Sequence, residues 1–201
     1  MTQQDFFGNQ PTPAAKTHPK RKPAKQPQHT WFFALRPSPE DAHRIHAIAD
    51  DLLAANGVTG KRIGPDRLHI TLDLVGHDVT PEVVAIACRA ADSIHFSPFE
   101  ARFDSLMTFT APSGPVVLLG TDGLNEVRDL RTALASAMAD CGFNPLRTYQ
   151  PHMTLSYDPR HRLPQMPVEP IGFVAREFAL VKSHIGHSRH EVIRTWHSTV
   201  M

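Results

Sequence analysis

Cysteine is scarce in this sequence, which has only Cys88 and Cys141 among 201 residues. Two residues are too few for a disulfide framework. Because both fall in segments with helical spacing, we interpret them as small buried side chains in a protein of the reducing cytoplasm. The sequence also lacks a run of about 20 apolar residues that could span a bilayer, and its N-terminus does not resemble a secretory signal. We therefore expect no contact with a membrane.

A large excess of charge is also missing, since the net charge is +1. Residues 1–29 carry a net charge of +4, so the rest of the chain carries −3. The same 29 residues hold five prolines and no hydrophobic periodicity, which predicts a disordered basic tail before one domain over residues 30–201. Because that domain is slightly acidic, any phosphate recognition must come from a local site rather than from bulk charge.

Several common functional motifs are absent. The sequence has no glycine-rich phosphate loop, no dinucleotide fingerprint and no Gly-x-Ser-x-Gly elbow. Four of the 13 histidines, His161, His184, His187 and His190, lie in turn-like stretches near the C-terminus, but their spacing matches no zinc pattern. We therefore expect neither a metal nor a cofactor.

The sequence does contain a succession of strand and helix patterns. Alternating or continuous apolar residues predict strands near 31–35, 68–75, 99–109, 116–120, 151–157, 177–183 and 191–199. Helix-start signals at Ser38, Thr80 and near Asp122 predict three helices. A proline-rich loop is expected at 159–170. The mixture predicts an α+β fold. Because a glycine-terminated helix twice precedes a His-x-Thr-Leu strand, we expect two similar lobes.

The repeated strand motif carries the chemistry. His69-Ile70-Thr71-Leu72 and His152-Met153-Thr154-Leu155 each place an imidazole and a hydroxyl on one face of a strand and apolar side chains on the other. One imidazole can take a proton while the other gives one, and a hydroxyl suits a phosphate oxygen. The pair therefore suits in-line displacement at phosphorus without a metal, as in hydrolysis of a 2′,3′-cyclic phosphate.

Other polar residues near the motifs have two interpretations each. Arg67 and Arg147, just upstream of the motifs, either clamp a phosphate or are solvated strand ends. Tyr149 and Phe109 either stack on a base or belong to the core or its rim. Asp73 is expected on the same face as Thr71, where it either orients the first histidine or is exposed.

These motifs resemble the two-histidine phosphoesterases, in particular the RNA 2′,3′-cyclic phosphodiesterases of bacteria and archaea, also called 2′-5′ RNA ligases. The resemblance covers about residues 31–199 and includes the stretches 31–35, 67–76, 151–155 and 180–183, and Trp196. It implies two pseudo-symmetric lobes of antiparallel sheet with outer helices and a central cleft. It also implies hydrolysis of RNA 2′,3′-cyclic phosphate ends to 2′-phosphates.

By this resemblance, His69 and His152 are the catalytic residues, and Thr71 and Thr154 bind the substrate. We assign His152 as the base and His69 as the acid, although the pseudo-symmetry leaves the reverse assignment open. Many relatives have an arginine soon after the second motif, whereas Leu155 is followed here by Ser-Tyr-Asp-Pro-Arg. The role of that arginine is open to Arg147 or Arg160, and Tyr157 is another candidate to contact the substrate. The missing arginine affects the expected substrate range and ligase activity more than the core chemistry.

Two alternatives to RNA hydrolysis remain. A phosphodiesterase could act on a small cyclic phosphate, such as a cyclic nucleotide or an ADP-ribose cyclic phosphate. A binding module could hold an RNA end without turnover, although such a module would not need both His-Thr pairs. In each case we expect a monomer without an obligate protein partner, and RNA or a small cyclic phosphate as the ligand.

Overall fold

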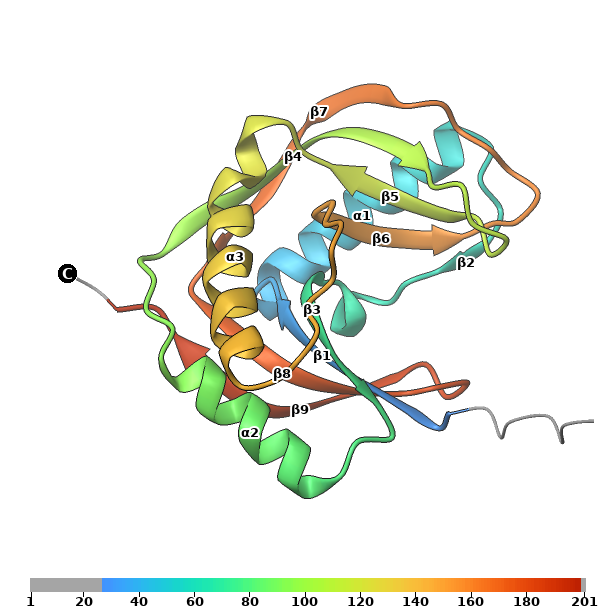
Figure 1. Ribbon diagram of the computed structural model, residues 1–201. Helices are drawn as coiled ribbons and strands as arrows, with labels where there is room; N and C mark the ends of the chain where they lie inside the picture. The colour runs from blue at the N-terminus through green and yellow to red at the C-terminus, as the bar shows by residue number, and fades with distance from the viewer. Residues whose placement is uncertain (1–26, 200–201) are drawn as a thin grey trace, which may run out of the picture.

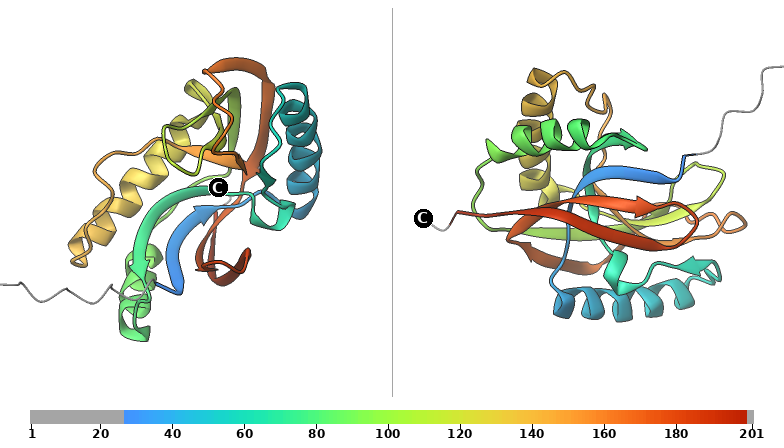
Figure 2. Two further views of the ribbon diagram at one scale, coloured as in Figure 1. Left: turned by 90° about the vertical axis from the view of Figure 1, so that its right-hand side faces the viewer. Right: turned by 90° about the horizontal axis from the view of Figure 1, so that it is seen from below.

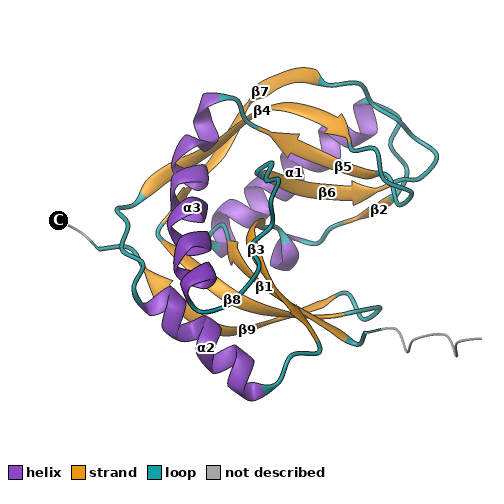
Figure 3. Ribbon diagram, viewed as in Figure 1, coloured by secondary structure: helices purple, strands orange, loops and turns teal. Residues whose placement is uncertain are grey.

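The structure is a computed structural model that describes residues 27–199. Most of the predicted basic tail therefore lies outside the described residues. In chain order the elements are β1 His29–Leu35, α1 Pro39–Ala55, β2 Lys61–Arg62, a 3-10 turn Pro65–Arg67, β3 Ile70–His77, α2 Pro81–Asp92, β4 Phe99–Thr108, β5 Pro115–Leu119, a second 3-10 turn Asp122–Leu124, α3 Asn125–Asp140, β6 His152–Tyr157, β7 Met166–Ala175, β8 Glu177–His184 and β9 Arg189–His197 (Figures 1 and 3). Over residues 27–199, no helix is long and apolar enough to cross a membrane.

The strands form one antiparallel sheet with the order β7-β4-β5-β6-β3-β1-β8-β9, and β2 pairs with β6. Strands β7, β4, β5 and β6 form one half, and β3, β1, β8 and β9 form the other (Figure 1). The two halves are joined between β3 and β6 by a single pair of partners, Ile70 and Met153. The predicted α+β class and antiparallel sheet are confirmed.

The three helices cover the two halves from different sides. Helix α1 contacts β7, whereas α2 contacts β9 and α3 contacts β3 and β4. Figure 2 shows α1 on one flank of the molecule and α2 and α3 on the other. Helix α1 begins as predicted, since the Ser38 hydroxyl accepts a hydrogen bond from the Asp41 amide at 3.1 Å. At the end of α3, Cys141 is exposed rather than buried as expected, and Cys88 in α2 is only partly buried.

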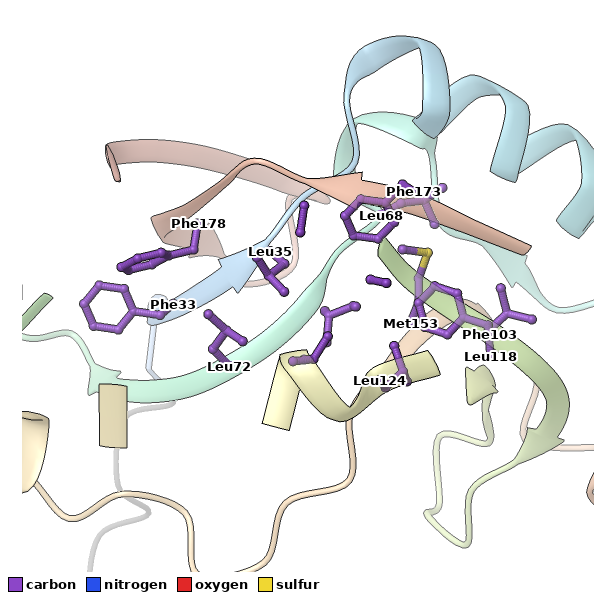
Figure 4. Close-up of a cluster of buried hydrophobic side chains, with 14 of the residues drawn as sticks. Phe33, Leu35, Leu68, Leu72, Phe103, Leu118, Leu124, Met153, Phe173 and Phe178 are labelled. Atoms are coloured by element: carbon purple, nitrogen blue, oxygen red, sulfur yellow. The ribbon is translucent and has the colours of Figure 1, made fainter. Parts of the chain in front are cut away.

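The core explains the orientation of the motif strands. Ile70, Leu72, Met153 and Leu155 all belong to one cluster of buried apolar side chains. Figure 4 shows part of this cluster, with Leu72 and Met153 among side chains from both halves of the sheet. Because side chains alternate along a strand, the motif histidines and threonines face away from this core.

A β-bulge follows each motif threonine. The pairing of β3 with β1 skips Leu72, and the pairing of β6 with β5 skips Leu155. An extra residue in one strand reverses the alternation beyond it. The next residues, Asp73 and Ser156, consequently turn back toward the core side and are both fully buried. The resemblance between the two halves therefore extends to the irregularities of their strands.

The bulge also corrects the prediction for Asp73, which does not share a face with Thr71. Its carboxylate lies 3.2 Å from the guanidinium of Arg131 in α3 and accepts a hydrogen bond from the Leu146 amide at 3.2 Å. Asp73 therefore ties β3 to α3 and to the loop before β6, and it does not orient His69.

The prediction of a proline-rich loop over residues 159–170 is partly wrong. Strand β7 begins at Met166 and pairs with β4 at residues 166–167 and 171–175. It is the edge strand of its half of the sheet, so Pro167 and Pro170, which have no amide hydrogen to donate, are tolerated there.

Candidate active site

The partners Ile70 and Met153 bring the two motifs side by side. In antiparallel strands, this register sets His69 opposite Thr154, and Thr71 opposite His152. Thr71 and His152 do line one cavity of about 500 Å³, together with Phe109, Leu146, Thr148, Tyr149 and Gln150. Each histidine thus has the threonine of the other motif as its neighbour across the strands.

The two motif histidines are anchored in the same way. Nδ1 of His69 donates to the Arg67 carbonyl at 2.6 Å, and Nδ1 of His152 donates to the Gln150 carbonyl at 2.7 Å. A carbonyl oxygen can only accept, so the proton of each neutral ring resides on Nδ1. Each ring consequently leaves Nε2 available for a ligand.

Two further rings lie against His69. Phe32 of β1 stacks on it with a centroid distance of 5.1 Å and an interplanar angle of 29°. His190 of β9 meets it edge-on, with a centroid distance of 5.2 Å and an angle of 72°. His190 was expected in a turn, but it belongs to a strand that starts at Arg189.

The charges around His69 are positive. Burial lowers the pKa of His69 to about 4, against the opposing effect of its bond to the Arg67 carbonyl, and the charges of His152, Arg36 and Arg67 lower it further. Burial likewise lowers the pKa of His190 to about 3, with contributions from His69, Arg67 and Arg36. Both rings are therefore neutral in the ligand-free protein near pH 7.

The surroundings of His152 are aromatic instead. The Phe109 ring meets it edge-on, with a centroid distance of 4.9 Å. Burial lowers the pKa of His152, opposed by its bond to Gln150. The Tyr149 hydroxyl donates to the Thr71 carbonyl at 3.0 Å. Of the two aromatic candidates, Phe109 therefore contacts a motif ring, whereas Tyr149 fastens the loop before β6 to β3.

The other predicted ligands lie in different places. Arg67 is close to His69. Arg147 is exposed in the loop between α3 and β6, and Tyr157 is 43% exposed at the far end of β6, where it pairs with Lys61 and Pro115. None of the contacts within residues 27–199 joins Arg147 or Tyr157 to a motif histidine. Over the same range, no group of three or more His, Cys, Asp or Glu side chains is arranged to hold a metal ion.

Known proteins share both the sequence pattern and the fold. The chain is 33% identical over 109 residues to an RNA 2′,3′-cyclic phosphodiesterase of Aeropyrum pernix, and 30% identical over 122 residues to one of Methanothermobacter thermautotrophicus. These segments are 53% and 59% of this chain, and 61% and 66% of those relatives.

The fold is that of solved structures of E. coli LigT. The structure complexed with ATP superposes with a TM-score of 0.67 at 23% identity, covering 87% of this chain and all of that one. The structure complexed with 3′-AMP gives 0.69 at 24% identity, with the same coverage. The sequence pattern of the 2′-5′ RNA ligase superfamily matches residues 37–186. This chain therefore belongs to the 2′-5′ RNA ligase superfamily.

Proposed function

We propose that this protein hydrolyses 2′,3′-cyclic phosphate ends of RNA to 2′-phosphates, with His69 and His152 as a paired base and acid. The observation that carries the proposal is the matched anchoring of the two rings, whose Nδ1 atoms donate to the Arg67 and Gln150 carbonyls. Two free Nε2 atoms then serve one phosphate from two sides. The names of the archaeal relatives support this substrate.

The proposed reaction follows from the tautomer of the rings. A neutral ring with its proton on Nδ1 has a lone pair on Nε2, which removes a proton from water as the water oxygen attacks phosphorus. The opposite ring is protonated on both nitrogens, and its Nε2 proton passes to the 3′ oxygen as the bond from that oxygen to phosphorus breaks. Thr71 and Thr154 donate hydrogen bonds to the remaining phosphate oxygens. The products are a 2′-phosphate and a 3′-hydroxyl.

The electrostatics favour one assignment of roles. Burial and, less strongly, the charges of Arg36 and Arg67 lower the pKa of His69, whereas burial, opposed by the bond to the Gln150 carbonyl, lowers that of His152. When the two rings share one proton, the ring that is harder to protonate is the neutral one, so we propose His69 as the base and His152 as the acid. This reverses the assignment made from the sequence.

The test is hydrolysis of a short RNA ending in a 2′,3′-cyclic phosphate, with EDTA present. We expect the wild type to release a 2′-phosphate, and His69→Ala and His152→Ala each to lose at least about a hundredfold in kcat/KM. His187→Ala is the matched control, because His187 is exposed in the β8–β9 turn. Full activity of either motif variant would refute the paired mechanism, and an inactive wild type would refute the RNA substrate.

The pH dependence tests the pairing itself. One ring must be neutral and the other protonated, so a plot of kcat/KM against pH should be bell-shaped. Its two apparent pKa values belong to the pair of histidines rather than to either one. A flat profile between pH 5 and 8 would contradict paired proton transfer. A nucleoside 2′,3′-cyclic phosphate and an ADP-ribose cyclic phosphate, assayed beside the RNA, separate a small-molecule substrate from an RNA end.

A further inference from the structure

His190 has no role in the mechanism above, yet its ring lies against that of His69. Its ring centroid is 5.2 Å from that of His69 and 5.6 Å from that of Phe32. It is only partly buried, and no hydrogen bond within residues 27–199 occupies its ring nitrogens. The His190 ring, which lies against His69, is therefore free to donate a hydrogen bond to a ligand.

Two arginines complete this group. Arg36 follows β1 and shares a strand face with Ala34, which belongs to the same small apolar cluster as Phe32. One Arg36 nitrogen donates to the Asp66 carbonyl at 3.0 Å, which leaves other guanidinium donors unused. Both Arg36 and Arg67 act electrostatically on the His69 and His190 rings. A partly buried cluster of this kind favours an anion.

The surroundings of His152 differ in chemistry. Phe109, Leu146 and Tyr149 line the cavity beside His152, and the Phe109 ring contacts that histidine. Those groups suit the flat face of a nucleobase and offer no charge to a phosphate. The site thus has aromatic side chains beside His152, and two arginines and a second imidazole beside His69.

We propose that His190, Arg36 and Arg67 form a second anion site beside His69, which binds the phosphate of the RNA chain next to the cyclic end. The inference rests on the proposed function, because the cyclic phosphate between His69 and His152 fixes the position of the rest of the substrate. In this site the guanidinium groups supply the charge and the neutral His190 ring donates one hydrogen bond.

The shared chemistry is a second phosphate on the same molecule as the reacting one. An RNA chain carries such a phosphate as a diester, and an ADP-ribose cyclic phosphate carries one as a pyrophosphate. We favour RNA because each nucleotide of the chain brings a backbone phosphate, and the curated relatives bear the name of RNA enzymes.

Calorimetric titration tests the site without requiring turnover. The probes are adenosine 3′-monophosphate and adenosine 3′,5′-bisphosphate, which differ only in the second phosphate. We expect the wild type to bind the bisphosphate at least about tenfold more tightly, and His190→Gln and Arg36→Gln each to reduce that ratio severalfold. His187→Gln, in the exposed turn of the same hairpin, is the matched control and should keep the ratio.

Three outcomes decide the proposal. Equal affinity of the wild type for both probes overturns the second site and leaves the proposed hydrolysis standing. Equal weakening of both probes by His190→Gln also overturns it, since His190 would then act only through His69. A preserved bisphosphate preference without hydrolysis of cyclic ends supports the anion site and refutes the proposed reaction.

A final comparison separates the two sources of the phosphate. A trinucleotide with a 3′-phosphate should bind more tightly than an ADP-ribose phosphate, and His190→Gln should weaken the trinucleotide more. The opposite order would overturn the assignment to RNA.

Discussion

Arg131 is the partner of a carboxylate that has no access to solvent. The Asp73 side chain is 0% exposed and that of Arg131 is 13% exposed, with 3.2 Å between Nη2 and Oδ2. The same guanidinium donates to the Leu146 carbonyl and lies 5.1 Å from the centroid of the Tyr149 ring. One side chain thus holds β3, α3 and the loop that leads to the second motif.

Replacing Arg131 with Met keeps much of the apolar stem and removes the charge. Asp73 is then buried without its ion-pair partner, which costs roughly 3–5 kcal/mol. The hydrogen bonds that Asp73 accepts from the Leu74 and Leu146 amides place the expected loss at the lower end, about 3 kcal/mol. For a domain of this size, that loss lowers Tm by roughly 6–12 °C.

Urea unfolding followed by circular dichroism measures the loss in the free energy of unfolding. Arg89→Met is the control, because Arg89 is exposed on α2, and it should change stability by less than about 0.5 kcal/mol. Asp73→Asn combined with Arg131→Met should cost less than the sum of the single changes. A loss below about 1 kcal/mol in Arg131→Met would refute the view that this pair holds the loop.

Three further predictions address the site and its supports. Because the pKa values of His69 and His190 are lowered to about 4 and about 3, the unfolded chain binds protons below about pH 6.5 that the folded chain does not. The free energy of unfolding, measured in urea at pH 7, 6 and 5, should therefore decrease as the pH decreases. The decrease should be less steep in His190→Gln. A free energy of unfolding that does not change with pH would contradict the burial of neutral rings. Gly114 has φ +58°, and a Cβ there would overlap the Asp158 carbonyl, so Gly114→Ala should cost about 2 kcal/mol or more in thermal unfolding, and a wild-type Tm would show that the turn can relax. Phe109→Leu removes a ring edge-on to the second motif histidine, so kcat/KM for a cyclic-phosphate RNA should fall about two- to tenfold, and an unchanged value would mean that the ring does not position the histidine.

The parts of the site that depend on local pattern could be predicted from the sequence. Alternation alone placed His69 and Thr71 opposite the buried Ile70, and the second motif repeats the arrangement. The helix start at Ser38 was equally local, since a hydroxyl and an amide three residues apart define it.

What escaped prediction depends on pairing between distant segments. The side on which Asp73 lies is decided by a bulge, which the partner strand reveals and the β3 sequence alone does not. His190 reaches His69 because β9 follows β8 and β8 pairs with β1, so its role is a property of the sheet order. Strand β7 was missed because its prolines argue against a central strand, and only the sheet order shows that it is at an edge.

The order of strands in the sheet has a consequence for synthesis of the chain. Apart from the short strand β2, the half with His152 is built from one continuous stretch, residues 99–175, whereas the half with His69 joins strands from both ends. Phe33 of β1 has Leu180 of β8 as its partner, 147 positions later. Contacts of such long range form late. On a ribosome, the first motif emerges well before the second, yet its half of the sheet is completed only after β8 and β9 have emerged.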